Sequence, residues 1–178
     1  LSDVLKSAGG ANSMAYIKGA RLERTITDEE RLRMNEVIRM TKMQGGKGDS
    51  IDVAKLDLGD KYYVGIQLDK ALENPGSEYD MILRDGDRII VPQYINTVKI
   101  SGDVLYPNTV LYSKGKNAKY YINQAGGYGS NAKKKHTYIV HMNGTVNQMG
   151  KGDKPTPGCE IIVPTKPQRD LTKVTQIA

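Results

Sequence analysis

The sequence predicts an α+β protein built from two related modules, and two observations indicate this class. The first is an internal repeat: LKSAGGANSMA at residues 5–15 resembles INQAGGYGSNA at 122–132, and DGDRIIVP at 85–92 resembles PGCEIIVP at 157–164. The second is that short, apolar, strand-like runs are interspersed with a few helix-like segments. Because the two repeat pairs are separated by different lengths of chain, the first copy contains an insertion that the second copy lacks.

The second copy, residues 96–165, contains a complete set of predicted elements. TVKISGDV alternates apolar Val98 and Ile100 with polar residues, as a half-buried strand does, and YPNTVLY predicts a second strand after a turn. GKNAKYYINQAGG predicts one short helix that stops at Gly126. Its packing residues at helical spacing would be Ala118, Tyr121, Ile122 and Ala125.

A hairpin and a last strand complete this copy. HTYIVHMNGTVNQM predicts the hairpin, since Asn143-Gly144 between alternating apolar residues suits a type I′ turn, and CEIIVP predicts the strand. The order strand, strand, helix, hairpin, strand is typical of the β-grasp fold. We therefore expect tandem β-grasp modules, each a mixed sheet with one crossing helix.

The first copy, residues 1–95, lacks the opening strands and is predicted to be N-terminally truncated. Its insertion, at about residues 25–70, includes the helix-like TITDEERLRMNEVIRMTKMQGG, in which Thr27 and Glu30 form a capping box. The packing stripe of this helix would be Met34, Val37, Ile38 and Thr41. The residues that follow, up to residue 83, predict short strands and turns. A sheet without its opening strands has unpaired edges, so this module is expected to be incomplete, rearranged or completed by another chain.

Composition narrows the function classes. A net charge of +6 and a pI near 9.2 favour acidic polymers, anionic surfaces or nucleic acid as neighbours. The single cysteine, Cys159, excludes an intramolecular disulfide and zinc sites built on paired cysteines. No apolar run is long enough to span a bilayer, and residues 166–178 form a polar tail that would approach a membrane segment outside this sequence.

The glycine-rich stretches and the histidines do not match known nucleotide or metal sites. MQGGKGDS has Gly48 where a phosphate-binding loop needs Ser or Thr after Lys47. AGGYGSNA follows a helix and lacks the third glycine of a dinucleotide fingerprint. His136 and His141 would point to opposite faces of a strand, so they are poor co-ligands for a metal ion.

Paired acids and the lone thiol are also better explained by structure than by catalysis. Asp85 and Asp87 flank Gly86, but the same place in the second copy is Gly158-Cys159-Glu160, so turn geometry explains the acids better than a glycosidase pair or a calcium site. Cys159 precedes an apolar strand without a recognisable base, so we expect a small buried residue. We expect no catalytic, cofactor-binding or metal site, no cofactor and no enzymatic activity.

The remaining candidates are three consecutive cations with a tyrosine before them. The candidate polymer-contact residues are Lys133, Lys134, Lys135 and Tyr128. Such cations can meet phosphates or an acidic glycan, with Tyr120 and Tyr121 as further stacking surfaces. The alternative is a solvated loop or an edge strand whose lysines discourage aggregation. The first copy has YIKGAR at this place, so a polymer contact would be a specialisation of the second module.

These stretches resemble one family. VKISGDVLYPNTVLYSKGKNAKYYINQAGGYGSNAKKKHTYIV resembles the soluble-ligand-binding β-grasp (SLBB) module, with its V-x-G-x-V-x-x-P strand pair, its helix and an AGG followed by N-A. LENPGSEYDMILRDGDRIIVP is similar to the join between two such modules in bacterial polysaccharide export proteins, the Wza-like outer-membrane auxiliary family. The resemblance covers nearly all of residues 2–164.

The resemblance implies a periplasmic, outer-membrane-associated part of a bacterial export protein for capsular polysaccharide or exopolysaccharide. It implies an oligomeric passage across the outer membrane, with polysaccharide, further copies in a ring and the inner-membrane export machinery as partners. Contact with the outer membrane would come through segments outside this chain, because the lipoprotein signal, the export domain and any membrane helix are absent from the sequence. The second hypothesis is a β-grasp module that binds a small molecule or nucleic acid, with nucleic acid the less favoured partner.

Overall fold

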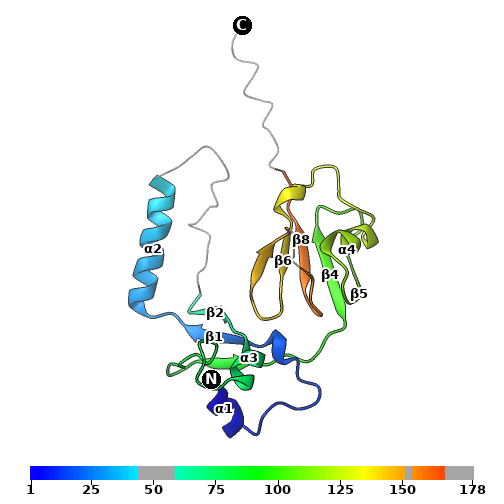
Figure 1. Cartoon of the computed structure of the whole chain (residues 1–178). Helices are drawn as coiled ribbons and strands as arrows, with labels where there is room; N and C mark the ends of the chain where they lie inside the picture. Colours follow the sequence, from blue (N-terminus) through cyan, green and yellow to red (C-terminus); the bar gives the residue numbers. More distant parts are fainter. Residues whose placement is uncertain (44–58, 151–153, 167–178) are drawn as a thin grey trace.

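The computed structural model describes residues 1–43, 59–150 and 154–166. Over these residues the chain has two β-sheets and a few helices, which confirms the α+β class. The sheets have the strand orders β2-β1-β3 and β5-β4-β8-β6-β7 (Figure 1). Residues 1–95, which contain the smaller sheet, are named the first unit, and residues 96–166 are named the second unit.

The second unit contains the five-stranded sheet and one α-helix. Its strands β4 and β8 lie side by side in parallel at the centre, and all other neighbours are antiparallel. A 3-10 helix, η3, leads into the hairpin strand β6. The elements are β4 (Thr97–Gly102), β5 (Asn108–Leu111), α4 (Ala118–Gln124), η3 (Lys134–His136), β6 (Tyr138–Val140), β7 (Val146–Gln148) and β8 (Glu160–Val163).

The core of the second unit lies between α4 and one face of this sheet. The alternation predicted for β4 is confirmed, because Val98 and Ile100 are buried while Lys99 between them is exposed. The predicted packing residues of α4 are all buried as well: Ala118, Tyr121, Ile122 and Ala125. Each large apolar side chain removed from water contributes roughly 1.5–3 kcal/mol, so the alternation and the helix stripe together account for this core.

The β6–β7 hairpin is present as predicted, but its turn differs from the predicted type I′ turn. The N–H of Gly144 donates to the carbonyl of His141 at 3.0 Å, so Met142 and Asn143 are the central residues and Gly144, with φ of +86°, follows them. The Asn143 side chain accepts hydrogen bonds from the N–H and the hydroxyl of Thr145. These bonds favour a three-residue loop, which the Asn-Gly pair alone does not reveal.

The first unit repeats only part of this arrangement. Its elements are α1 (Ser2–Ser7), η1 (Ile17–Gly19), β1 (Arg21–Thr25), α2 (Asp28–Met43), β2 (Lys61–Gly65), α3 (Leu68–Glu73) and β3 (Arg88–Ile90). The order β2-β1-β3 corresponds to β7-β6-β8, and α1 and η1 correspond to α4 and η3. The same backbone hydrogen bond is found in both units. The N–H of Tyr16 donates to the carbonyl of Pro92 at 2.7 Å, and the N–H of Lys133 donates to the carbonyl of Pro164 at 2.7 Å.

The prediction of a mixed sheet in each module is wrong for the first unit. Both of its strand pairs, β1 with β2 and β1 with β3, are antiparallel. In the second unit the one parallel pair is made by β4 with β8. No counterpart of β4 or β5 exists among the described residues of the first unit, so its sheet has no strand that could run parallel to β3.

Helix α2 begins with the predicted capping box. The N–H of Glu30 donates to the Thr27 hydroxyl at 3.2 Å, and the N–H of Thr27 donates to the Glu30 carboxylate at 3.1 Å. Arg84 donates to the same carboxylate at 2.7 Å, which ties the base of the helix to the loop before β3. Beyond this base, α2 extends away from the sheet (Figure 1).

The predicted packing stripe of α2 is wrong for the two members whose side chains are described. Met34 is 36% exposed and Val37 is 63% exposed. The side chains of Ile38 and Thr41 lie outside the described residues. The stripe is uncovered because the helix projects past the narrow three-stranded sheet, which does not reach its upper turns (Figure 1).

The structure also corrects the prediction of strands and turns up to residue 83. Residues 59–83 contain strand β2 but also the helix α3, whose Leu68 and Ala71 are fully buried against Leu22 of β1. The helix LDKALE has only six residues and no side-chain cap at its start, so the capping signal that marks the start of a helix is missing. The part of this prediction that falls on residues 44–58 lies outside the described residues.

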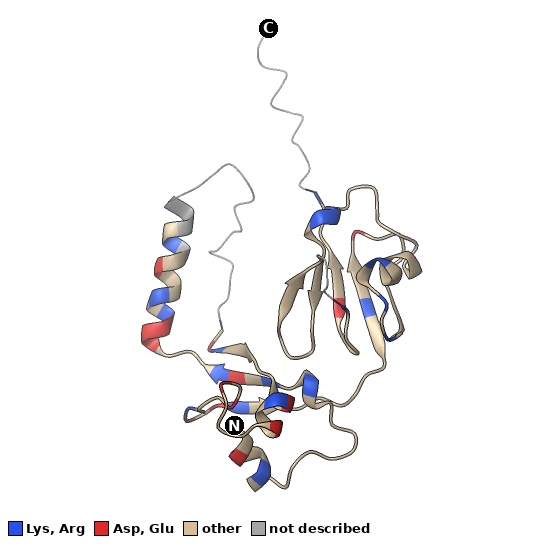
Figure 2. Ribbon diagram, viewed as in Figure 1, with Lys and Arg blue, Asp and Glu red and all other residues tan. Residues whose placement is uncertain are grey.

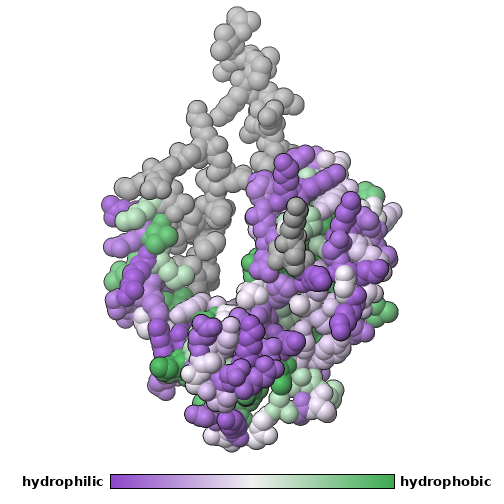
Figure 3. Space-filling view, viewed as in Figure 1, coloured by the Kyte–Doolittle hydropathy of each residue, from purple (hydrophilic) through white to green (hydrophobic). Residues whose placement is uncertain are grey.

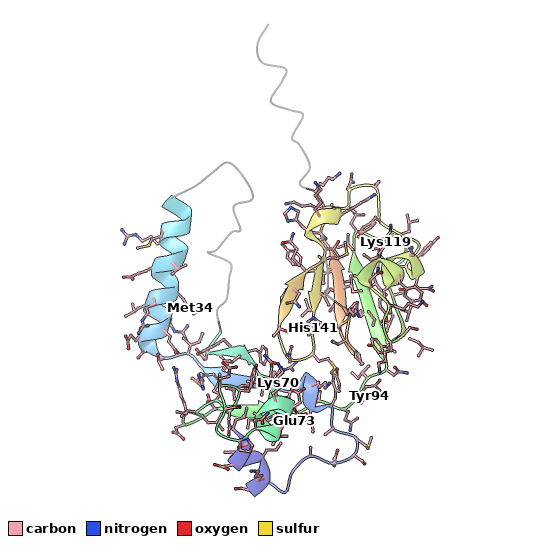
Figure 4. The ribbon with its side chains drawn as sticks, viewed as in Figure 1. Met34, Lys70, Glu73, Tyr94, Lys119 and His141 are labelled. Carbon is pink, nitrogen blue, oxygen red and sulfur yellow. The ribbon has the colours of Figure 1, made fainter. Side chains whose placement is uncertain are left out.

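The two units touch where the hairpin loop of the second meets the first. The Asn143 side chain donates to the carbonyl of Ile66 at 3.5 Å, and the methyl group of Thr145 leaves no room for a side chain at Gly65. Within the first unit, the rings of Tyr16 and Tyr94 pack edge to face at 5.5 Å between centroids. In Figure 4, Tyr94 lies on the segment that joins the units and His141 at the end of the hairpin strand that faces the first unit.

Candidate functional site

The predicted lysines lie on η3, at the end of the second unit from which β6 begins. Lys134 and Lys135 are exposed and Lys133 is half-buried. The backbone of this turn is held from three sides, by the 2.7 Å bond from the N–H of Lys133 to Pro164, by the buried Thr137 hydroxyl and by Gln148. The expected loop or edge strand is therefore a 3-10 turn, whose side chains Lys134 and Lys135 are exposed. The ribbon of this turn is blue in Figure 2.

Tyr128 is brought against this turn. The ammonium of Lys134 lies 5.3 Å from the centre of the Tyr128 ring, within the range of a cation–π interaction. Tyr128 is half-buried, and its backbone forms an isolated bridge with Val104, two residues after β4. We name Tyr128, Lys133, Lys134 and Lys135 the lysine corner.

The other two tyrosines proposed as stacking surfaces do not join the lysine corner. Tyr121 is fully buried, and its hydroxyl both donates to the carbonyl and accepts from the N–H of Ser113. The Tyr120 ring packs edge to face on Tyr121 and lies under the ammonium of Lys116 instead. Their helical spacing makes one of them a core residue, so the stacking expected of Tyr121 is wrong.

The lysine corner has the charge to attract an anionic polymer. Exposed ammonium groups attract carboxylate or phosphate through several ångströms of water, and a Debye length of about 8 Å at physiological salt limits that reach. The half-buried ring of Tyr128 offers an apolar surface beside these charges. The visible face of the second unit is mainly hydrophilic, with only small apolar patches (Figure 3).

The AGG segment before the lysine corner ends helix α4, as predicted. Gly126 and Gly127 have φ of +79° and +93°, the left-handed region that terminates helices. The N–H of Gly127 donates to the carbonyl of Ile122 at 2.9 Å. These amides are used within the chain, in agreement with the interpretation of this loop as a helix stop.

Asp85 and Asp87 flank a turn glycine as predicted, and Asp87 has a further role that the sequence did not reveal. Gly86 has φ of +80°. Both carboxylate oxygens of Asp87 accept from the Arg24 guanidinium, at 2.8 and 2.7 Å, and this hydrogen bonding lowers the pKa of Asp87. The two side chains are almost entirely buried, so the acid belongs to the core of the first unit.

Cys159 occupies the corresponding place in the second unit and is buried as predicted. Its thiol is 1% exposed, and burial raises its pKa to about 11. A thiol in this state is a poor nucleophile at neutral pH, because the reactive form is the thiolate.

The two histidines are not brought together. His136 belongs to η3, whereas Nδ1 of His141 lies 2.7 Å from the hydroxyl of Thr156. Across residues 1–43, 59–150 and 154–166, no group of three or more His, Cys, Asp or Glu side chains is arranged to hold a metal ion.

Sequence reasoning missed three further pairs of a cation with a tyrosine ring. These pairs are Arg21 with Tyr63 at 4.7 Å, Lys70 with Tyr79 at 4.5 Å and Lys116 with Tyr120 at 5.1 Å. The amino-acid composition could have predicted such pairs. The chain has eleven tyrosines, no Phe or Trp and a basic surface, so many tyrosine rings must lie near cations. A shallow hollow at the base of α2 was also missed; it is lined by Glu30, Arg33, Met34 and Tyr62.

The membrane question has a limited answer. Among the helices of the described residues, none is both long and apolar enough to cross a bilayer.

Comparison with known proteins gives one consistent result. No family model matches the chain. Two Escherichia coli proteins, each named polysialic acid transport protein KpsD, are 31% identical to it over 96 residues. The match covers 54% of this chain but only 17% of each relative, so the chain spans a small part of their length. Their name describes the transport of a polysaccharide and not an enzymatic reaction. Over about half of its length, the chain is thus similar to polysaccharide export proteins.

Proposed function

We propose that this chain is a non-enzymatic, periplasmic portion of a bacterial protein that exports capsular polysaccharide or exopolysaccharide. In this proposal, copies of the full-length protein assemble into a passage across the outer membrane and work with inner-membrane export machinery. The observation that carries the proposal is the similarity to two polysialic acid transport proteins over 96 residues.

We propose further that the two units are tandem β-grasp modules of the SLBB type, with boundaries at 1–95 and 96–165. The second unit supports this assignment through its strand order, in which the first and last strands are parallel neighbours at the centre of the sheet. One helix, α4, packs on that sheet. The first unit supports it because its elements recur in the same order as the second half of the other.

The lysine corner is the proposed contact for the polymer. Polysialic acid, the polymer named for the relatives, carries a carboxylate on every sugar, and a chain with a net charge of +6 attracts such a polymer. The contact would be weak and salt-sensitive, because exposed ammonium groups gain little from each pairing in water. Weak contacts suit transport, since a tightly bound polymer would stop moving.

Titration of the isotope-labelled chain with polysialic acid tests this contact. Amide resonances of residues 128–137 are expected to shift. The shifts are expected to shrink steeply between about 50 and 200 mM salt, because the Debye length shortens over this range and the charges are screened more strongly. The variant K133Q/K134Q/K135Q is expected to weaken binding at least about tenfold. The matched control K6Q/K18Q/K70Q removes the same charge from exposed lysines of the first unit and is expected to change binding by less than about twofold.

Two results would contradict the polymer contact. One is an equal loss of affinity in both triple variants, which would mean that only net charge matters. The other is a shift pattern with single-stranded DNA that exceeds the pattern with polysialic acid at equal charge concentration, which would favour the nucleic-acid hypothesis. Neutral dextran serves as the uncharged control polymer.

The transport role itself is tested in the bacterium that carries the gene. Deletion is expected to remove polysaccharide from the cell surface while polymer accumulates inside the cell. Normal surface polysaccharide after deletion would refute the transport role, whatever the lysine corner binds.

A further inference from the structure

Strand β3 of the first unit is an edge strand, whereas its counterpart β8 has a neighbour on each side. Among the described residues, β3 pairs only with β1. β8 pairs with β6 on one side and, in parallel, with β4 on the other, from Lys99 opposite Glu160 to Gly102 opposite Val163. The side of β3 that faces away from β1 is therefore the position where a parallel strand would pair.

The apolar face next to this edge is only partly covered. Alignment of the repeats places Val4 of α1 at the position of Tyr121 and Ala8 at that of Ala125. Tyr121 and Ala125 are 0% exposed, whereas Val4 is 50% exposed and Ala8 is exposed. The first unit thus exposes two of the four helix positions that the second unit buries; at the other two, Leu1 is buried and Leu5 is half-buried.

The same difference is found on the strand. Ile161 and Val163 of the second unit are fully buried, but the matching Ile89 and Val91 of the first unit are only half-buried. Since Ile161 and Val163 lie opposite β4, the uncovered area is the area that β4 covers in the complete sheet.

The glycine loop after the helix differs between the units in the same way, because in the first unit no described segment contacts it. In the second unit, Tyr106 donates to the carbonyl of Ala125 at 2.9 Å, and Leu105 donates to that of Gly127 at 3.2 Å. A side chain added at Gly126 would meet Leu105. At the corresponding Gly9 an added side chain would meet nothing within 4 Å. The segment after β4 thus also has no described equivalent in the first unit.

We propose that the edge of β3 and the exposed face of α1 form an acceptor site for a polypeptide β-hairpin. The first strand of this hairpin runs parallel to β3 and inserts two β-branched side chains between β3 and α1, as Val98 and Ile100 do beside β8 and α4. A glycine ends that strand, because at Gly102 any side chain would collide with the carbonyl of Val163. The second strand pairs with the first and closes the edge.

A hairpin fits this site better than a second copy of the chain does. The β4 strand of another copy is already paired on both sides, so it cannot be offered without opening its own sheet. The edge strands β5, β7 and β2 do not offer two alternate exposed apolar side chains that could fill the face. Their exposed alternate residues are Thr109 and Leu111 in β5, Val146 and Gln148 in β7, and Lys61, Tyr63 and Gly65 in β2. Only a separate strand with an apolar side can cover both the edge and α1.

The experiment adds the synthetic peptide of residues 97–112, TVKISGDVLYPNTVLY, to the isotope-labelled full chain. We expect resonance shifts in α1, in residues 8–12 and in β3, and amide exchange at Ile89 and Val91 slowed at least about tenfold. A peptide with V98D and I100D is expected to bind at least about tenfold more weakly, because both inserted side chains become charged.

Matched variants of the chain test the location. V4E places a charge where the hairpin would bury Val4 and is expected to weaken peptide binding at least about tenfold. Since Val4 is half exposed in the free chain, this variant should keep its fold, which its own spectrum verifies. V146E changes an equally exposed valine on β7 and should leave peptide binding unchanged.

Several results would overturn the proposal. They are the absence of any shift at about 1 mM peptide, equal losses in V4E and V146E, and shifts confined to the edges of β5, β7 or β2. Protection of Ile89 and Val91 that rises with chain concentration in the absence of peptide would instead identify a second copy as the occupant.

Discussion

Arg24 and Asp87 form a bidentate ion pair in the core of the first unit, at the positions that His141 and Cys159 occupy in the second. The guanidinium donates to both carboxylate oxygens, at 2.8 and 2.7 Å, and the Asp87 side chain is 2% exposed. The backbone of the turn before β3 and before β8 is the same. The backbone N–H of Asp87 donates to the carbonyl of Arg84 at 3.1 Å, and the backbone N–H of Cys159 donates to that of Thr156 at 3.1 Å. One turn geometry therefore supports an ion pair in one unit and a buried thiol in the other.

Removal of the Asp87 charge is expected to destabilise the first unit. D87N leaves the buried guanidinium without its counter-charge, and such losses cost about 3 kcal/mol. Urea unfolding, followed by the amide exchange of β1, measures the change. D60N is the control, because Asp60 pairs with Arg31 on the surface and its loss should cost less than about 0.5 kcal/mol. Equal effects of the two variants would contradict the assigned role.

The same pair predicts a pH dependence. Hydrogen bonding to Arg24 lowers the pKa of Asp87 in the folded state, so this group contributes stability above the pKa of an unfolded aspartate, about 3.9. The contribution is lost as the pH falls through the folded-state pKa. The difference in unfolding free energy between the wild type and D87N is thus expected to be largest at neutral pH and to shrink below about pH 4. A difference that does not change with pH would refute the argument.

Alanine substitutions at two glycines with similar φ angles distinguish the cost of a steric collision from the cost of backbone strain. Gly102 and Gly115 have φ of +86° and +82°, but only at Gly102 would a side chain collide with the neighbouring strand, at the carbonyl of Val163. G115A is expected to cost about 1 kcal/mol from strain alone. G102A should cost at least about 2 kcal/mol more, because it separates the parallel strands β4 and β8. Thermal unfolding of the two variants measures the difference, and similar values would show that no close approach exists.

Cys159 is expected to react slowly with thiol reagents while the chain is folded. Burial raises its pKa to about 11 and shields the sulfur. At pH 8 little of the thiol is therefore ionised, and the reagent cannot easily reach the sulfur. Labelling with a chromogenic disulfide should be at least about 1,000-fold slower than in urea, since it requires opening of β8. Labelling of the native chain at the rate of a free cysteine would contradict this burial.

The capping box of α2 supports a further prediction. T27A removes the hydroxyl that accepts from Glu30 and should cost about 1 kcal/mol of helix stability. Faster amide exchange in residues 28–31 is the measurement. T25A, at the exposed end of β1, is the control and should leave that exchange unchanged.

Much of the fold follows from local patterns. The β4 alternation, the α4 stripe and its glycine stop, and the Thr27–Glu30 box were each readable within about two turns or one strand, and all are confirmed by burial or hydrogen bonds. The repeat further indicated that the first unit lacks opening strands. The candidate site was only partly readable: Lys134 and Tyr128 do meet, but Tyr121 belongs to the core.

The sequence by itself determined the places of most helices and strands, with α3 as an exception, because propensity, capping and periodicity act over a few neighbouring residues. Only the tertiary structure decided which of these surfaces are covered. Met34 and Val37 of the α2 stripe are exposed because α2 projects past the three-stranded sheet, whose Tyr62 reaches only the base of the helix (Figure 1). Arg24 pairs with Asp87, which lies 63 residues away in the sequence. Burial and pairing depend on residues far apart in sequence. The repeat predicted unpaired sheet edges in the first unit, but only the structure identified β3 as such an edge.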